Sequence, residues 1–335
     1  MPGSGLRDAD MQWDFWTLSP ESAHQVTYLM GDRGLPRSWR YMPGYGSHTY
    51  QWINAAGERF WIKYHFHALE GNDELDSLTA VGIAAVDADF YRRDLYEAIE
   101  REEFPKWRMF VQVMPYGEAK TYRFNPFDLT KVWPHEDYPL MEVGVHTLNE
   151  NPQNFFAQIE QAAFSPANTV PGIDISPDRM LMARVFSYPD AQRYRLGTNY
   201  SELPVNRPLS PVRDYSQDGL GRHRYKPGES PVYAPNSVGG PVADEVRAGV
   251  GGWESDGALQ RSAASLHAED DDFGQAGALY RDVFSDEAKS RFRETVTAAL
   301  AGIRSAEIRE RAVRYWTNVD ADLGRTVRTR LTRGS

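Results

Sequence analysis

The chain of 335 residues contains no cysteine. This absence excludes disulfide frameworks, thiolate metal sites, iron–sulfur ligation and cysteine nucleophiles. No apolar run approaches the ~20 residues of a membrane span, and residues 1–10 lack the basic and apolar regions of a signal peptide. The sequence therefore predicts a soluble, cytoplasmic protein that does not interact with a membrane.

Positive charge is also scarce. The 37 Lys and Arg residues against 47 Asp and Glu give a net charge of −10. Because such a balance repels phosphate backbones, nucleic acid is not expected as a partner. Aromatic residues, by contrast, make up 13% of the chain, which favours large flat contacts in a core or around a planar ligand. At roughly 150 residues per domain, the length predicts about two structural units.

Hydrophobic periodicity predicts an α+β fold. Alternation of apolar and polar residues predicts strands at residues 48–55, 59–68, 107–115 and 140–149. Apolar residues at helical spacing, together with capping residues, predict helices at residues 19–29, 154–163 and 177–188 and within residues 75–103. Strands interrupted by helices are typical of α+β domains.

The second half of the chain changes character twice. From residue 197 to residue 252, Pro and Gly recur every few residues, which predicts a segment that wraps over a surface. After residue 272 the composition changes to Ala, Arg, Glu and Leu. This composition predicts two or three amphipathic helices at the carboxyl end.

Arg184 and Tyr188 are the most informative pair for chemistry. On a helix, positions four apart share a face, so the guanidinium of Arg184 can reach the phenol oxygen of Tyr188. An adjacent fixed cation favours the phenolate form of a tyrosine, and a phenolate is a hard anionic ligand for ferric iron. Arg195 follows about two turns later, where it could pair with a carboxylate on a ligand, and Pro189 is expected to kink the helix. Spacing alone leaves a second interpretation open, an ordinary buried tyrosine beside a surface arginine.

The pattern Arg184-x-x-x-Tyr188-x-Asp190-x-x-x-x-Arg195 resembles the proximal haem signature of the monofunctional haem catalases of the small-subunit type. Further matches occur in family order along essentially the whole chain, at residues 14–22, 32–34, 44–49, 132–135, 137–140, 149–154, 171–172 and 196–200. Tyrosine is the axial ligand of haem iron in catalases. The resemblance therefore implies haem as the cofactor and hydrogen peroxide as the substrate.

The resemblance also implies roles for individual residues. Tyr188 corresponds to the ligand of the haem iron, Arg184 holds it as phenolate, and Arg195 pairs with a haem propionate. His48 and Asp178 correspond to a relay behind Arg184 that orients it. Packing alone would also explain Phe164 and Met180, which correspond to apolar haem contacts, and a satisfied core histidine would explain His48.

Some members of this family bind NADPH away from the haem, and the matching positions are partly kept. The positions that agree are His24, Arg33, His65, Val132, Trp133 and His135. Gly31, Pro43 and His67 replace the Ser, Asn and Lys of the nucleotide-binding members. NADPH therefore stays open as a second cofactor. His65 and His67, on one face of a strand, are alternatively a metal-binding pair, although two ligands are a weak signal.

By this resemblance the fold is catalase-like, with half of the antiparallel β-barrel. Residues 1–196 are predicted to form a partial barrel with the haem helix, residues 197–265 a wrapping connection, and residues 266–335 a helical domain. We expect the distal His and Asn of the family to lie outside this chain, because they precede the segment that corresponds to Met1. The full-length protein is expected to be a homotetrameric catalase. The alternative is a non-catalytic truncated protein that binds haem or partner subunits.

Overall fold

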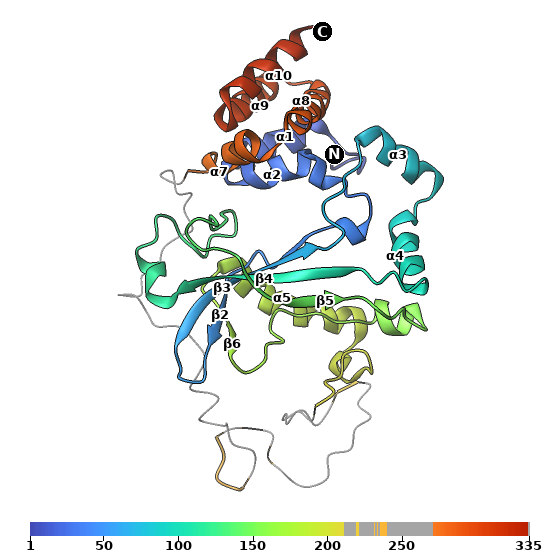
Figure 1. Cartoon of the computed structure of the whole chain (residues 1–335), viewed down its shortest axis with the longest axis vertical. Coiled ribbons are helices and arrows are strands. Elements are labelled where there is room, and N and C mark those ends of the chain that lie inside the picture. The colour runs from blue at the N-terminus through green and yellow to red at the C-terminus, as the bar shows by residue number, and fades with distance from the viewer. Residues whose placement is uncertain (211–218, 221–230, 232, 234, 240–270, 334–335) are drawn as a thin grey trace.

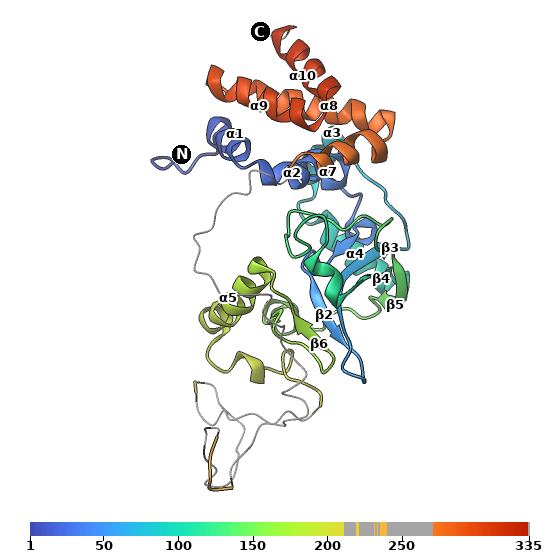
Figure 2. The same ribbon diagram turned by 90° about the vertical axis from the view of Figure 1, so that its left-hand side faces the viewer.

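The computed structural model describes residues 1–210, 219–220, 231, 233, 235–239 and 271–333. Most of the predicted wrapping connection after residue 210 lies outside the described residues. Figure 1 shows a bundle of terminal helices at one end of the long axis and a twisted sheet below it, and Figure 2 shows a long helix to one side of the sheet.

The sheet is antiparallel and open within the described residues. Its strands are β1 (Gly44–Tyr45), β2 (Tyr50–Ile53), β3 (Arg59–Ala68), β4 (Lys106–Pro115), β5 (Met141–Thr147) and β6 (Ile173–Ile175). They are ordered β5-β4-β3-β2-β6, and β1 also pairs with β3. The predicted α+β class and the four predicted strands are confirmed. The two-residue β1 and three-residue β6 are too short to give an alternation signal, so the sequence missed them.

The helices of the first two hundred residues differ from expectation mainly in their bounds. They are α1 (Ala9–Leu18), α2 (Ala23–Met30), α3 (Ser77–Val86), α4 (Phe90–Glu100) and α5 (Arg179–Leu196), with short turns at Pro20–Ser22, Asp32–Gly34, Trp39–Tyr41, Tyr116–Lys120 and Tyr200–Glu202. Residues 154–163 form only a π-helical turn at Phe156–Glu160. Helix α5 continues through Pro189 for two further turns, since a proline removes one donor but the flanking bonds persist.

The carboxyl-terminal helices share one core with the first thirty residues. They are α7 (Gly274–Ala278), a π-helical turn (Leu279–Val283), α8 (Asp286–Ala301), α9 (Ala306–Val319) and α10 (Ala321–Arg333). Trp13 of α1 packs against Trp316 of α9, and Val26 of α2 joins the same buried cluster. Figure 2 shows α1 and α2 beneath α8 and α9, with α7 beside α2. The division of the chain into three domains stays a prediction.

Ion pairs reinforce this contact between the two ends of the chain. Asp10 lies 3.0 Å from the guanidinium of Arg304, and Asp32 lies 2.6 Å from that of Arg291. In the described part of the chain, no helix combines the length and apolar character needed to cross a membrane.

Candidate functional site

Asp178 anchors the beginning of helix α5. Its Oδ1 accepts hydrogen bonds from the backbone N–H groups of Met180 (2.9 Å) and Leu181 (3.0 Å), as an N-cap residue does. The side chain is 2% exposed. Ser176 holds the preceding loop to the sheet, because its hydroxyl donates to the carbonyl of Thr49 just before β2. The start of α5 is thus fixed against the residue that links His48 to β2.

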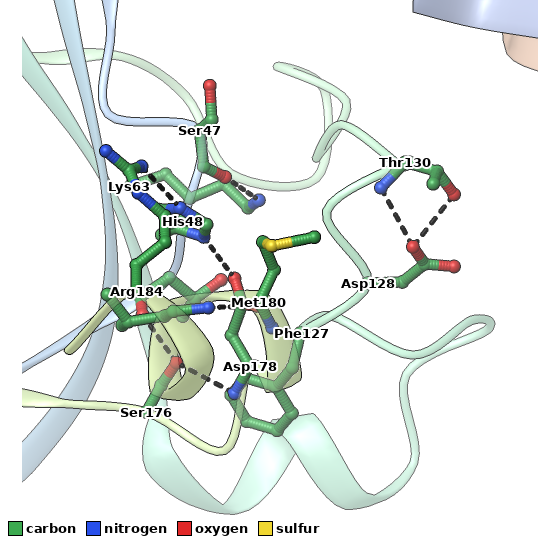
Figure 3. A network of polar contacts seen from close by, with 12 residues as sticks. Ser47, His48, Lys63, Phe127, Asp128, Thr130, Ser176, Asp178, Met180 and Arg184 are labelled. Atoms are coloured by element: carbon green, nitrogen blue, oxygen red, sulfur yellow. Dashed lines mark hydrogen bonds and ion pairs between the residues drawn. The ribbon is translucent and has the colours of Figure 1, made fainter. Parts of the chain in front are cut away.

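His48 connects Asp178 to Arg184 (Figure 3). Its Nδ1 lies 2.7 Å from Oδ2 of Asp178, and Nη1 of Arg184 lies 2.8 Å from its Nε2. A guanidinium can only donate, so Nε2 accepts and the imidazole is neutral, with its proton on Nδ1. Burial raises the pKa of Asp178, but hydrogen bonds from His48 and from two backbone N–H groups outweigh it and leave the pKa below its usual value. The relay therefore ends in a buried carboxylate.

Tyr188 accepts a hydrogen bond from the other terminal nitrogen of the same guanidinium. Nη2 of Arg184 donates to the phenol oxygen over 2.8 Å, and the guanidinium carbon lies 5.1 Å from the ring centroid. Arg184 is half-buried and fixed by the fully buried His48, so it is not the surface arginine of the second interpretation. A continuous chain of hydrogen bonds runs from Asp178 through His48 and Arg184 to the half-buried phenol.

Arg195 lies two turns beyond Tyr188 on α5. Its Nε donates to Oε1 of Gln192 (2.9 Å), and its Nη2 donates to the carbonyl of Ala162 (2.6 Å). A further bond reaches the carbonyl of Glu160. The guanidinium is thus used to hold the segment before Phe164 against α5, and its pairing with a haem propionate stays a prediction.

The donor set at the exposed end of the relay fits a haem iron. The phenol oxygen of Tyr188 keeps lone-pair capacity beyond the bond from Arg184. Phe164 (81% exposed) and Met180 (51% exposed) present apolar side chains from the adjoining segment and from the first turn of α5. Oxygen ligand and apolar surface are what a porphyrin requires.

A second group of predicted residues gathers between α2 and β3. Nη1 of Arg33 donates to the hydroxyl of Tyr45 over 3.4 Å, and the ring of Tyr45 packs edge-on against His65 at 5.7 Å. The rings of His65 and His135 are 6.1 Å apart, while His24 packs on Tyr28, which also lies under Arg33. The structure thus brings together His24, Arg33, His65 and His135.

Trp133 and Val132 differ from these four. The Trp133 side chain is 2% exposed and donates to the carbonyl of Pro126, so it belongs to the core. Both backbone polar groups of Val132 are bonded to the side chain of Gln275 on α7. A ligand contact by Val132 would therefore involve its exposed side chain and not its backbone.

The family model described as catalase matches residues 1–240, and a second model, described as catalase-related immune-responsive, matches residues 266–331. The chain belongs to the catalase family. The predicted family is thereby confirmed.

Individual relatives agree. The chain is 51% identical over 331 residues to a bromoperoxidase-catalase of Streptomyces venezuelae, covering 97% of this chain and 67% of the relative. It is 45% identical to a catalase of Helicobacter pylori, covering 95% and 63%. The structure of a bacterial catalase superposes with a TM-score of 0.90 at 47% identity, over 100% of this chain and 68% of that one. Catalase A of Saccharomyces cerevisiae gives 0.88 at 36% identity, over 99% and 69%. The chain spans about two thirds of the length of these catalases, and the catalase-like fold is confirmed.

His65 and His67 do not form a metal site with a third ligand in this catalase-family chain. Nε2 of His65 lies 2.9 Å from Oε1 of Gln112, and the ring of His67 packs on Phe110. Across the described ranges, no three His, Asp or Glu residues are close enough together to hold a metal ion. The metal interpretation of the pair gains no support from the geometry.

His24 and His65 make the stability of the fold sensitive to acid. Burial, with the nearby charge of Lys131, lowers the pKa of His24 from 6.5 to about 4, and burial likewise lowers the pKa of His65 to about 4. The unfolded chain therefore takes up these protons first, so stability is complete above pH 6.5 and is lost as the pH falls towards 4. We expect the free energy of unfolding to drop by roughly 2–3 kcal/mol per histidine over this range.

Denaturant unfolding at several pH values measures this loss. His24→Gln should reduce the slope of the free energy of unfolding against pH. The same substitution at the exposed His146 serves as the control for removal of an imidazole. An unchanged slope in His24→Gln would contradict the assignment.

The sequence reasoning missed two residues beside the relay, Ser47 and Lys63. Lys63 shares one face of β3 with the buried Trp61, and the ammonium itself is buried. A lysine that directly follows the apolar run Phe60 to Ile62 of a strand was the available signal. Such a group needs partners, which only the tertiary structure identifies.

Proposed function

We propose that Tyr188 is the axial ligand of a haem iron and that this chain carries the iron-binding side of a catalase centre. Membership of the catalase family implies haem as the cofactor. The observation that carries the proposal is the two-sided use of Arg184, which donates one N–H to the buried His48 and another to the phenol oxygen of Tyr188. A fixed cation at a phenol oxygen favours the phenolate, the form that binds ferric iron.

Each residue of the relay has a separate role. Asp178 stays ionised and fixes the Nδ1 tautomer of His48, and His48 in turn holds Arg184 by accepting from Nη1. Arg184 keeps its second N–H on the phenol oxygen. When bound, the haem supplies the redox chemistry, and an anionic tyrosine on its iron donates electron density. Met180 and Phe164 would cover the ring, and Arg195 would face a propionate.

The reaction we propose is the disproportionation of hydrogen peroxide to water and dioxygen. Cleavage of the O–O bond also needs a base on the opposite face of the haem. By family correspondence, His24, His48, His65, His67, His135 and His146 do not occupy that position. We propose that the distal histidine and asparagine belong to a part of the complete protein that corresponds to the remaining third of its relatives.

An assembly surface supports this proposal. Strand β5 lies at one end of the strand order among the described residues, and Met141, Val143 and Val145 on it are each about half exposed. Unpaired strand edges and apolar faces are normally covered in a stable protein. We propose that the missing part of the barrel, and the other subunits of a homotetramer, cover this edge.

Oxygen release measures the proposed activity. The purified, haem-loaded chain is compared with an equal concentration of free haem after addition of hydrogen peroxide. We expect haem binding through Tyr188 with slight oxygen release from this chain alone. Haem binding with no release above free haem would favour the alternative, a non-catalytic haem-binding or assembly protein. No binding at all would overturn the proposed function and the haem-binding alternative, and would leave only the assembly protein.

NADPH binding at the cluster of Arg33, His65 and His135 is a further proposal. His67 stands where the nucleotide-binding members carry lysine, so one cation for a phosphate is missing. Burial lowers the pKa of His67, with a smaller effect from His135, so the imidazole is neutral near pH 7. We expect His67→Lys to tighten NADPH binding about 2- to 5-fold, the value of one exposed ion pair.

Fluorescence titration with NADPH checks this prediction at two salt concentrations. The gain should shrink at high salt, because an exposed ion pair is screened. Arg33→Ala is the opposing variant and should weaken binding. Equal affinities of the parent chain and His67→Lys at low salt would contradict this location of the nucleotide phosphate.

A further inference from the structure

The residue before His48 has an unusual backbone conformation. Ser47 has φ 58°, one of only two positive values among the non-glycine residues that the structure describes. The N–H of His48 donates to the carbonyl of Gly46 over 2.6 Å, which closes a three-residue γ-turn with Ser47 at its centre. A γ-turn with positive φ is rare and strained. Such strain persists only where surrounding contacts hold it.

Strand β3 supplies these contacts. The N–H of Gly46 donates to the carbonyl of Tyr64 over 2.9 Å, and the Lys63 ammonium donates to the carbonyl of Ser47 over 2.9 Å. Two neighbouring residues of β3, Tyr64 and Lys63, thus form hydrogen bonds with Gly46 and Ser47 of the turn. Figure 3 shows the Lys63 side chain extending past His48 to the Ser47 carbonyl. A Cβ on Gly46 would lie only 3.2 Å from that of Tyr64, so the turn lies close against the strand.

The Lys63 ammonium is expensive to bury. Its residue is 6% exposed, and its charge lies 5.4 Å from the centre of the Trp133 ring. Burial lowers its pKa to about 8, while the charges of Asp178 and Asp128 act in the opposite direction. An ammonium carries a large desolvation cost when buried. A buried ammonium is therefore expected where its charge makes a specific contact.

We propose that Lys63 is a positioning residue of the relay, which holds the strained turn at Ser47 and thereby aims His48 at Asp178 and Arg184. The proposal rests on the proposed function, because it assigns Lys63 to the orientation of the Tyr188 partner. Lys63 touches neither Tyr188 nor Arg184 in the described contacts, so it acts through the backbone of Ser47 and through His48. The sequence-based assignment of the relay ended at His48.

The Nδ1 proton of His48 reports this role without any haem. The sample is the chain of 335 residues labelled with nitrogen-15 histidine. A protonated Nδ1 bonded to a buried carboxylate should give an NMR signal that is protected from exchange with water. The signal of His48 is identified by its loss in His48→Gln. We expect Lys63→Met, which keeps the apolar stem, to lose this signal. Lys63→Arg, which keeps the cation, should retain it. Lys131→Met is the matched control, because it removes another buried lysine that is bonded to Asp272.

Ser47→Gly makes the test independent of simple destabilisation. Glycine adopts positive φ without strain, so the turn should no longer need the ammonium. We expect the Nδ1 signal to return in the double variant Ser47→Gly with Lys63→Met. A retained signal in the single variant Lys63→Met would overturn the proposal. So would a signal that stays lost in the double variant, or a failure of Lys63→Met to fold in both backgrounds, since either result assigns Lys63 to the stability of the sheet.

The haem-loaded chain gives a second measurement. If Lys63 orients the relay, Lys63→Met should alter the ferric absorption spectrum, while Lys131→Met should leave it unchanged. A parent chain that binds no haem through Tyr188 overturns the proposed function and leaves the NMR result readable. The two hypotheses thus fail separately.

Discussion

Tyr188→Phe should abolish the absorption of a ferric tyrosinate complex in the haem-loaded chain and remove any oxygen release above free haem. The substitution deletes only the phenol oxygen, which is the ligand atom and the acceptor of the bond from Arg184. Phenylalanine offers no lone pair to iron. We therefore expect haem affinity to fall by at least tenfold, or about 1.4 kcal/mol. Optical titration with haem and peroxide-driven oxygen release are the two measurements.

Tyr194→Phe is the matched control, because Tyr194 lies on the same helix and is 87% exposed. It should leave the spectrum and the affinity unchanged. Arg184→Lys adds a graded case: lysine keeps a cation but cannot bond His48 and Tyr188 with two separate N–H groups of a planar fork. A spectrum of Tyr188→Phe identical to that of the parent chain would show that another residue binds the iron.

The sequence predicted those features that depend on local pattern. Strands β3 and β4 are long and alternate clearly, so their existence and class followed from the period of the side chains. The contact of Arg184 with Tyr188 followed from helical spacing, since both residues lie on α5. The family resemblance then placed His48 and Asp178 beside Arg184, where the structure also has them.

Features that depend on distant contacts were beyond local pattern. The packing of Trp13 against Trp316 joins residues more than 300 positions apart, and no periodicity signals it. The turn at Ser47 has its positive φ only because β3 grips it from a separate segment. Arg195 lies on α5, yet the carbonyls that it bonds belong to the segment before Phe164. The position of a residue on a helix follows from the neighbouring sequence, whereas the hydrogen-bond partners of its side chain depend on segments elsewhere in the chain.

Asp178→Asn should be the most damaging conservative change in the relay. Asp178 uses both carboxylate oxygens as acceptors: Oδ1 takes two backbone N–H groups of α5, and Oδ2 takes the Nδ1 proton of His48. Asparagine has one acceptor oxygen and one NH₂ donor, so one of these sites faces a donor. A buried donor left unsatisfied costs about 1–3 kcal/mol, so we expect a loss of about 2 kcal/mol in the free energy of unfolding.

The control is Asp76→Asn, which changes another N-cap aspartate, at the start of α3, whose bonds are exposed to water. Asparagine is an equally good N-cap there, so we expect a change below about 0.5 kcal/mol. The pH dependence of Asp178→Asn gives a second measurement. Because the pKa of Asp178 is lowered in the folded chain, its contribution is present above the usual value of 3.8 and is lost as the pH falls below it. Denaturant unfolding between pH 7 and pH 3 should therefore show a smaller acid-induced loss for Asp178→Asn than for the parent chain, and equal losses would contradict the charged relay.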